Sequence, residues 1–154
     1  MRFWDWAGEA YARSGVEPLC LELQDDHLLS APYLLWAAWA AATGRTLTEQ
    51  QLHTAAEVAK AWEEDVIGHL RAARRALRPP EAGADTRGFP ELRQQVKTAE
   101  LTAERMLMES LEMTAPPRTR QPLAYEPALV RATLAFGRVV PADLLARLAE
   151  RLPT

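Results

Sequence analysis

The densest group of side chains that could do chemistry is the run Gln24-Asp25-Asp26-His27. Two carboxylates and an imidazole can hold a divalent cation or act as general acid and base. Adjacent residues on a helix point about 100° apart, so these groups converge on one ion only with help from distant ligands. A polar helix end in water, with His27 near the helix dipole, is the simpler interpretation. We therefore expect no catalytic residue and no metal ligand, and retain Gln24 and Asp25 as a candidate polar cluster.

A basic stripe is the second candidate. Four arginines recur at i, i+3, i+4 and i+7, which places them on one helix face: Arg71, Arg74, Arg75 and Arg78. Such a stripe could bind an acidic protein, RNA or an anionic lipid headgroup. The alternative is a solvated face near a helix C-terminus, paired across a hairpin with Glu100 or Glu104.

Tryptophans form the third candidate, because the chain has five of them: Trp4, Trp6, Trp36, Trp39 and Trp62. An indole N–H needs a partner, so some of these rings are expected near polar groups or the edge of a cavity. Trp36, Trp39 and Trp62 could line an apolar ligand pocket between helices. An ordinary aromatic core is the competing interpretation.

The remaining reactive residue types give no motif. Cys20 lies among apolar neighbours and is expected to be a small buried hydrophobe. His53 and His69 are not spaced as a zinc-binding pair on a helix. We therefore predict no cofactor.

Helices must position all of these residues, since helix formers dominate and period-2 alternation is absent. We predict an all-α, single-domain helical bundle of about seven helices. The expected segments are 3–13, 17–27, 32–43, 48–77, 91–113, 126–136 and 141–152. Ser30 and Thr48 are expected N-caps, the latter in a capping box with Gln51. The third segment is apolar on nearly all faces and is the candidate central helix.

The two longest segments predict an antiparallel αα-hairpin joined by a loop at 78–90. One buried apolar stripe is expected along the first arm and a heptad-like seam along the second. The stripe comprises Ala55, Ala59, Trp62, Val66, Leu70, Ala73 and Leu77, and the seam Leu92, Val96, Ala99, Ala103 and Met106. Gly68, inside the first arm, predicts a kink or a close helix contact.

Composition and length set the broad class. The 154 residues suit one domain, which we divide into a helical bundle core at 3–113, a Pro-rich linker at 114–124 and a C-terminal helical extension at 125–154. The formal net charge of −3 makes nucleic-acid binding unlikely. The most apolar run, Ala31 to Ala42, is too short to span a membrane. A lone cysteine and the absence of a signal-peptide pattern predict a cytoplasmic protein.

Several short motifs together resemble an uncharacterised bacterial family of small helical cytosolic proteins, catalogued only as a domain of unknown function. The resemblance covers Phe3 to Met113. It is carried by Phe3-Trp4-Asp5-Trp6-Ala7 with Tyr11, Gly15-Val16, Cys20-Leu21, Leu23-Gln24-Asp25, Leu34-Leu35-Trp36 with Trp39, Trp62 with Val66, Leu70-Arg71, Arg74-Arg75, Val96-Lys97, Glu100-Leu101 and Ala103-Glu104-Arg105. It implies a helical fold and no assigned activity.

Three functional hypotheses follow from these patterns. The leading one is a non-enzymatic helical protein-interaction module that binds another protein or itself, because the sequence offers an arginine stripe and an amphipathic C-terminal segment but no catalytic motif. The first alternative is a small-molecule or lipid-binding helical protein with a tryptophan-lined pocket. The second is a metal-dependent enzyme that uses the cluster Asp25-Asp26-His27.

Overall fold

The computed structural model describes residues 1–78 and 89–154, and within these ranges every regular element is a helix, as predicted. The predicted loop at 78–90 falls almost wholly outside the described residues. The elements in chain order are α1 (Phe3–Ala12), α2 (Val16–His27), α3 (Ala31–Ala42), α4 (Glu49–Trp62), the π-helical turn η1 (Glu63–Ile67), α5 (Gly68–Ala76), α6 (Phe89–Thr114), α7 (Tyr125–Phe136) and α8 (Ala142–Arg151).

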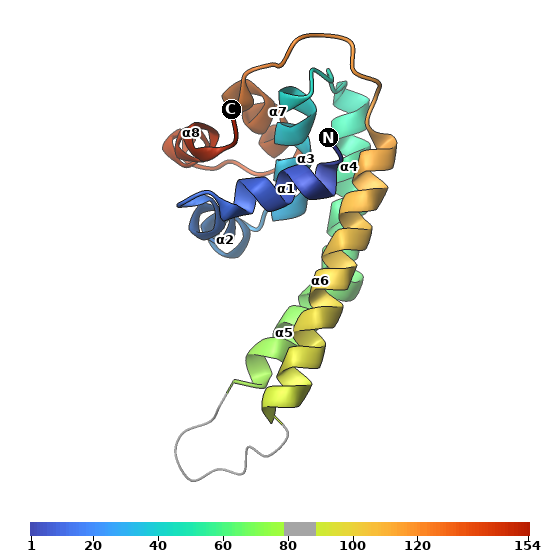
Figure 1. The fold of residues 1–154 in the computed structure, drawn as a ribbon, viewed down its shortest axis with the longest axis vertical. Coiled ribbons are helices and arrows are strands. Elements are labelled where there is room, and N and C mark those ends of the chain that lie inside the picture. Colours follow the sequence, from blue (N-terminus) through green and yellow to red (C-terminus); the bar gives the residue numbers. More distant parts are fainter. Residues whose placement is uncertain (79–88) are drawn as a thin grey trace.

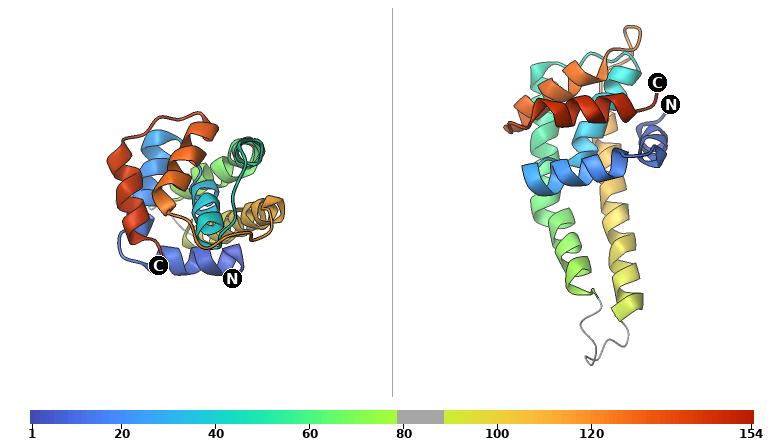
Figure 2. Two further views of the ribbon diagram at one scale, coloured as in Figure 1. Left: turned by 90° about the horizontal axis from the view of Figure 1, so that it is seen from above. Right: turned by 90° about the vertical axis from the view of Figure 1, so that its left-hand side faces the viewer.

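The helices form a head and a projecting hairpin (Figures 1 and 2). Helices α1, α2, α3, α7 and α8 form the head, in which both chain termini lie. The continuous arm α4–η1–α5 runs antiparallel to α6, and the two arms extend well below the head. Their upper parts pack on the head and their lower parts pack mainly on each other. The predicted hairpin is therefore present.

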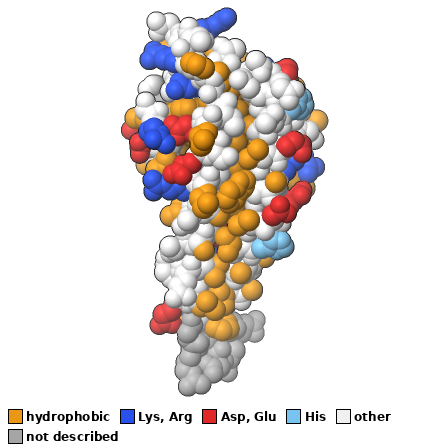
Figure 3. Space-filling view, turned by 90° about the vertical axis from the view of Figure 1, so that its right-hand side faces the viewer, with side chains coloured by type: hydrophobic (Ala, Val, Ile, Leu, Met, Phe, Trp, Pro, Cys, Tyr) orange, Lys and Arg blue, Asp and Glu red, His pale blue; other side chains and the backbone are white. Residues whose placement is uncertain are grey.

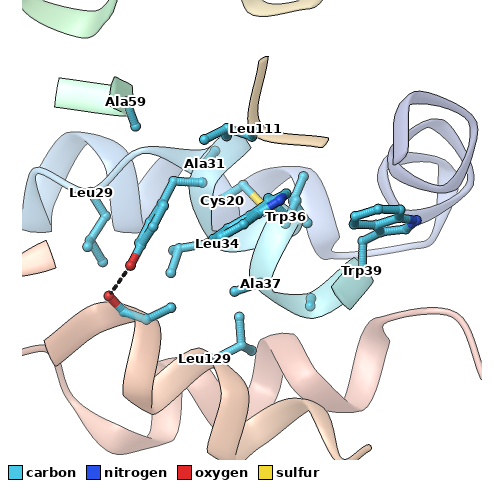
Figure 4. Packing of buried hydrophobic residues seen from close by; sticks show 14 of the residues in the cluster. Cys20, Leu29, Ala31, Leu34, Trp36, Ala37, Trp39, Ala59, Leu111 and Leu129 are labelled. Carbon is cyan, nitrogen blue, oxygen red and sulfur yellow. Dashed lines mark hydrogen bonds between the residues drawn. The ribbon is translucent and has the colours of Figure 1, made fainter. Parts of the chain in front are cut away.

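Helix α3 is the centre of the head because it is apolar on all sides. All but one of its residues are buried, and it packs against α1, α2, α4, α6 and α7. The side chains of Trp36 and Trp39 are both fully enclosed in this core (Figure 4). The helix begins where predicted: the Ser30 hydroxyl accepts a hydrogen bond from the backbone N–H of Tyr33 at 3.3 Å. The capping box of Thr48 and Gln51 also forms in both directions.

The C-terminal helices share the same hydrophobic core as the rest of the chain. Leu129 of α7 and Leu148 of α8 are fully buried, and α7 packs against both α3 and α4. The segment leading to them is held by the end of α3, where the carbonyl of Gly44 accepts hydrogen bonds from the backbone N–H groups of Thr119 and Arg120. The extension at 125–154 thus docks on its own chain. The division of the chain into a core at 3–113, a linker at 114–124 and an extension at 125–154 stays a prediction.

The first hairpin arm contains a π-helical turn that the sequence pattern did not predict. Across η1 the N–H of Gly68 bonds to the carbonyl of Glu63, five residues back. The turn inserts one extra residue, which rotates the following helix by about 100°. The inward positions consequently fall one residue later than expected. They are taken by Ile67, which is 1% exposed, and by the side chains of Arg71 and Arg74.

The structure corrects both predicted apolar stripes, and the rotation accounts for the one on the first arm. The upper residues Ala55 and Ala59 are buried as expected, but Val66 is 37% exposed and Ala73 is exposed. On α6 only Ala103 of the predicted seam is buried, while Met106 is 51% exposed. Two helices can cover only the sides that face each other, so beyond the head these apolar side chains have no third helix over them.

Candidate functional site

The middle of the hairpin holds a network of ion pairs. The Arg74 guanidinium donates two hydrogen bonds to the Glu100 carboxylate, at 2.6 and 3.3 Å. One turn higher, Arg71 donates to both carboxylate oxygens of Glu63 and lies 3.7 Å from Glu100. The network joins η1, α5 and α6, and it exists because the π turn directs both arginines inward. We call it the waist network.

Burial makes this network different from a surface ion pair. The side chains of Arg71 and Glu100 are each only 11% exposed. Burial acts against the charged form of Arg71, but its hydrogen bond to Glu63 and the charges of Glu63 and Glu100 outweigh it, so the pKa lies above the ordinary value. For Arg74, the hydrogen bond to Glu100 is the largest cause of a raised pKa. Removing Arg74 would leave the buried Glu100 carboxylate without its closest partner.

Glu104 lies one turn along α6 from Glu100 and brings a third carboxyl group to the waist network. Burial is the main reason that its pKa rises to about 7, and the nearby charge of Glu100 adds to the effect while Arg71 opposes it. Among the described residues no hydrogen bond is donated to its carboxyl group. The charge of Glu104 therefore changes close to neutral pH.

Two pockets flank the waist network, and both include Gln24, Arg71 and Arg75 in their walls. The larger has a volume of about 430 Å³ and lies between the end of α2, η1 and the end of α7; Lys60, Glu63, Leu28 and Phe136 are among its other lining residues. The smaller, of about 230 Å³, is lined in addition by Tyr11, Glu17, Cys20, Leu21, Ala31, Arg74, Glu100 and Glu104. The pockets are polar on the hairpin side, so they can bind a charged small molecule.

The predicted polar cluster is divided by the structure. Gln24 and Asp25 line the larger pocket, and Asp25 lies 3.4 Å from Arg75. Asp26 is exposed, and His27 is the last residue of α2. Within residues 1–78 and 89–154, no three His, Cys, Asp or Glu side chains gather closely enough to hold a metal ion. The arrangement gives no support to a metal-dependent enzyme built on Asp25, Asp26 and His27.

The predicted arginine stripe is also divided. Arg71 and Arg74 belong to the waist network, Arg75 faces the pockets, and Arg78 is exposed beyond the end of α5. Pairing with Glu100, the predicted alternative, is present for Arg71 and Arg74. Of the four, Arg75 and Arg78 are the exposed ones, and Arg75 is paired with Asp25 at 3.4 Å.

The tryptophans line neither pocket. Trp36 and Trp39 are core residues, and Trp62 is partly buried near the end of α4. The indole N–H of Trp39 donates to the carbonyl of Met1 at 3.1 Å, whereas that of Trp36 is buried without a partner among the described residues. The two pockets beside the waist network are thus lined by charged residues, unlike the tryptophan-lined pocket that the sequence suggested.

Several residues of this site, among them Glu63 and Tyr11, were not predicted as site residues from the sequence. Glu63 was not singled out, and Tyr11 entered only through the family resemblance. The sequence feature that could have indicated Glu63 is Gly68, five residues later. A glycine lets the carbonyl five residues earlier approach closely, as a π turn requires. Tyr11 is brought to Glu104 by the packing of α1 on α6, for which the sequence holds no local signal.

Fold and site together define an all-α helical protein whose projecting hairpin holds a buried ion-pair network. A family model described as "Protein of unknown function (DUF2390)" matches residues 2–111, which is more than half of the chain. The chain belongs to this family, as the resemblance over Phe3 to Met113 indicated. The matched region contains all but the last three residues of the hairpin, the waist network and most of the pocket residues. The comparisons found no match among curated proteins or among solved structures.

Proposed function

We propose that this protein is a non-enzymatic, helical protein-interaction module that binds its partner along the exposed apolar side of the hairpin. We call this surface the hairpin seam. From one arm it takes the exposed Val66 and Ala73 with the partly buried Trp62 and Leu70, and from α6 the exposed Ala99 and Met106 with the partly buried Val96. None of the helices in the described part of the chain is long and apolar enough to cross a membrane, and the lone Cys20 suits a reducing cytoplasm of a bacterial cell.

The observation that carries this proposal is the continuity of the exposed apolar surface. In Figure 3 hydrophobic side chains form a band that follows the hairpin downward from the head, with charged side chains on both flanks. Val66 and Met106 are 37% and 51% exposed. A large apolar patch bordered by polar residues is typical of a protein-interaction site, whereas isolated exposed apolar residues are common everywhere.

A second copy of the same chain is the partner that the seam fits best. The contact between Arg74 and Glu100 fixes the height of the two arms relative to each other, so Ala73 and Ala99 lie at one level. Val66 and Met106 lie seven residues away along their arms, about 10 Å closer to the head. In an antiparallel pair, the large side chains of one copy would lie over the alanines of the other. The result would be a symmetric four-helix bundle.

The arginines contribute less to this surface than the sequence suggested. Arg71 and Arg74 are bound within the chain, and Arg75 lies about 200° round α5 from Ala73, where it faces the pockets. Exposed charges outside an apolar interface affect the rate and specificity of association more than its strength. Burial of apolar side chains is therefore the main source of binding energy in this proposal.

The test is sedimentation velocity of the purified protein at increasing concentration. We expect a monomer–dimer equilibrium that is shifted at least tenfold toward monomer by Met106→Glu or Val66→Glu. Each change places a charge on a surface that the dimer would bury. Leu101→Glu is the matched control: Leu101 is 55% exposed on the same helix but points away from the seam. A protein that stays monomeric at every concentration, or three variants that behave alike, would rule out self-assembly through this surface.

A further inference from the structure

The upper end of the molecule in Figure 1 is formed by parts of the chain that contain no acidic residue. No Asp or Glu occurs at 27–48 or at 113–125, although the whole chain has a formal net charge of −3. These two segments carry three arginines: Arg45, Arg118 and Arg120. The second segment arches over this end of the head between α6 and α7 (Figure 1). Positive charge is therefore concentrated at one end of an acidic protein.

Backbone contacts hold the two segments together, so the three arginines share one surface. The carbonyl oxygen of Gly44 accepts hydrogen bonds from the N–H groups of Thr119 and Arg120, both at 3.1 Å, and Arg45 is the residue after Gly44. Gly44 has a φ of +70°, and a Cβ atom there would overlap the carbonyl oxygen of Arg120, so this crossing requires glycine. We call the surface formed by Arg45, Arg118 and Arg120 the basic end.

No ion pair within the described residues neutralises the basic end. Two of the acidic residues that border its segments are already paired with other arginines: Glu49 with Arg131 at 2.7 Å and Glu112 with Arg2 at 2.9 Å. A third, Glu126, lies in the first turn of α7, where the helix dipole favours a negative charge. In contrast to the waist network, this surface keeps its positive charge available to a partner.

Exposed apolar side chains lie beside these arginines. Met113, one residue before the end of α6, is 86% exposed, and Met1 is 66% exposed. The Met1 carbonyl accepts a hydrogen bond from the indole N–H of Trp39, and the Arg45 guanidinium lies over the same indole, 4.7 Å from the ring centroid. Trp39 therefore brings Met1 and Arg45 close together. The surface combines guanidinium groups with long apolar side chains.

The shape of the basic end restricts the kind of partner. Figure 3 shows the upper end of the molecule as a rounded surface on which Lys and Arg side chains gather. The hollow beside Arg45 has a volume of only about 40 Å³, too small for a bound molecule or for a peptide that needs a groove. Nucleic-acid bases need an exposed aromatic ring to stack on, and Trp39 is buried. A flat anionic surface needs neither feature.

We propose that the basic end binds the surface of an anionic phospholipid membrane, with Arg118 and Arg120 on the phosphate groups of the lipids. A guanidinium group donates two parallel hydrogen bonds to a phosphate, and each cationic residue near an anionic membrane strengthens attachment several-fold. Met1 and Met113 enter the headgroup region beside them, which adds burial of apolar surface. The hairpin then points away, and most of its acidic residues lie beyond the roughly 8 Å over which charges act at physiological salt.

The experiment is co-sedimentation of the full chain with vesicles at low salt. One set is made of phosphatidylcholine alone, and the other of phosphatidylcholine with an equal amount of phosphatidylglycerol. We expect binding to the anionic vesicles only, and its gradual loss as salt is added, because salt screens the attraction. Arg118→Glu combined with Arg120→Glu should weaken the affinity roughly tenfold or more. Met113→Gln should weaken it several-fold, because an amide is costly to bury beside the lipid chains.

The matched control is Arg138→Glu combined with Arg147→Glu. It makes the same change in net charge, but Arg138 lines the larger pocket and Arg147 lies on α8, so the affinity for anionic vesicles should stay within about twofold. Circular dichroism of all variants separates loss of binding from loss of folding. The basic end and the hairpin seam use different residues, so either proposal can fail without the other.

Four results would overturn the proposal. The first three are no sedimentation with anionic vesicles at low salt, equal sedimentation with neutral vesicles, and an equal loss of affinity in both double variants. The last of these would mean that net charge alone attracts the protein. The fourth is tighter binding to a double-stranded DNA oligonucleotide or to polyglutamate, compared at the same concentration of negative charge. It would assign the basic end to another kind of polyanion.

Discussion

A methyl group added at Gly68 would lie 2.6 Å from the backbone carbonyl oxygen of Glu63. This close approach accompanies the π turn, because the same carbonyl accepts the hydrogen bond of the Gly68 N–H. Because of the π turn, Arg71 and Arg74 point toward α6 and Val66 is exposed. One glycine thus permits both the waist network and the hairpin seam.

Gly68→Ala should destabilise the protein, although the same change usually stabilises a helix by about 1 kcal/mol. The added methyl group must displace backbone atoms, and we expect a net loss of about 1–3 kcal/mol in the free energy of unfolding. Gly8→Ala is the matched control, since α1 leaves open space around that position. It should gain about 0.5–1 kcal/mol. Urea denaturation of both variants decides the matter, and equal stability would contradict the role given to Gly68.

Arg74→Met should cost about 2–4 kcal/mol of stability, because it leaves the Glu100 carboxylate buried without its strongest partner. The pair Arg147–Asp143 on α8 is the comparison, with both side chains at least half exposed. Arg147→Met should change stability by no more than about 0.5 kcal/mol. Thermal denaturation at moderate salt measures both. A small effect of Arg74→Met would mean that water replaces the ion pair.

Glu104 should make the protein less stable as the pH rises from about 4.5 to 7. Its pKa is raised to about 7 in the folded state from an ordinary value of 4.5, so the folded state binds more protons in that range and loses stability as they leave. Glu104→Gln should remove this loss, with a gain on the order of 1–2 kcal/mol at pH 8 and little change at pH 4.5. Chemical denaturation at the two pH values tests the sign. A variant less stable than the parent at pH 8 would contradict it.

Cys20 should be unreactive in the folded protein. Burial, with a smaller contribution from the charge of Glu17, raises the pKa of its thiol to about 12, and only the thiolate attacks alkylating reagents. Iodoacetamide at pH 8 should modify it only in denaturant, as mass spectrometry would reveal. Rapid modification of the native protein would indicate that the smaller pocket opens as far as the sulfur.

Leu148→Ala should destabilise the whole protein by about 2–5 kcal/mol, since Leu148 is fully buried in the common core. Leu134→Ala on α7 is the control, with a side chain 63% exposed and an expected change of no more than about 0.5 kcal/mol. A single unfolding transition that shifts as one unit is expected. A separate transition for α7 and α8 would instead support a division at 114–124.

Much of the fold follows from local sequence. Ser30 and Thr48 begin helices because their hydroxyl groups satisfy free N–H groups a few residues away. Helix α3 is central because its sequence has no polar face to place in water. Family membership could also be inferred from short motifs, and the match to residues 2–111 confirms it.

The tertiary structure alone decides the site. The apolar pattern from Ala55 to Leu77 follows normal α-helical spacing, but the π turn shifts it by one residue, because packing against α6 and the close contact at Gly68 outweigh local periodicity. Tyr11 and Glu104 meet only through the packing of α1 on α6. Such contacts depend on the free energy of burial and charge pairing summed over the whole fold. A short stretch of sequence does not reveal that sum.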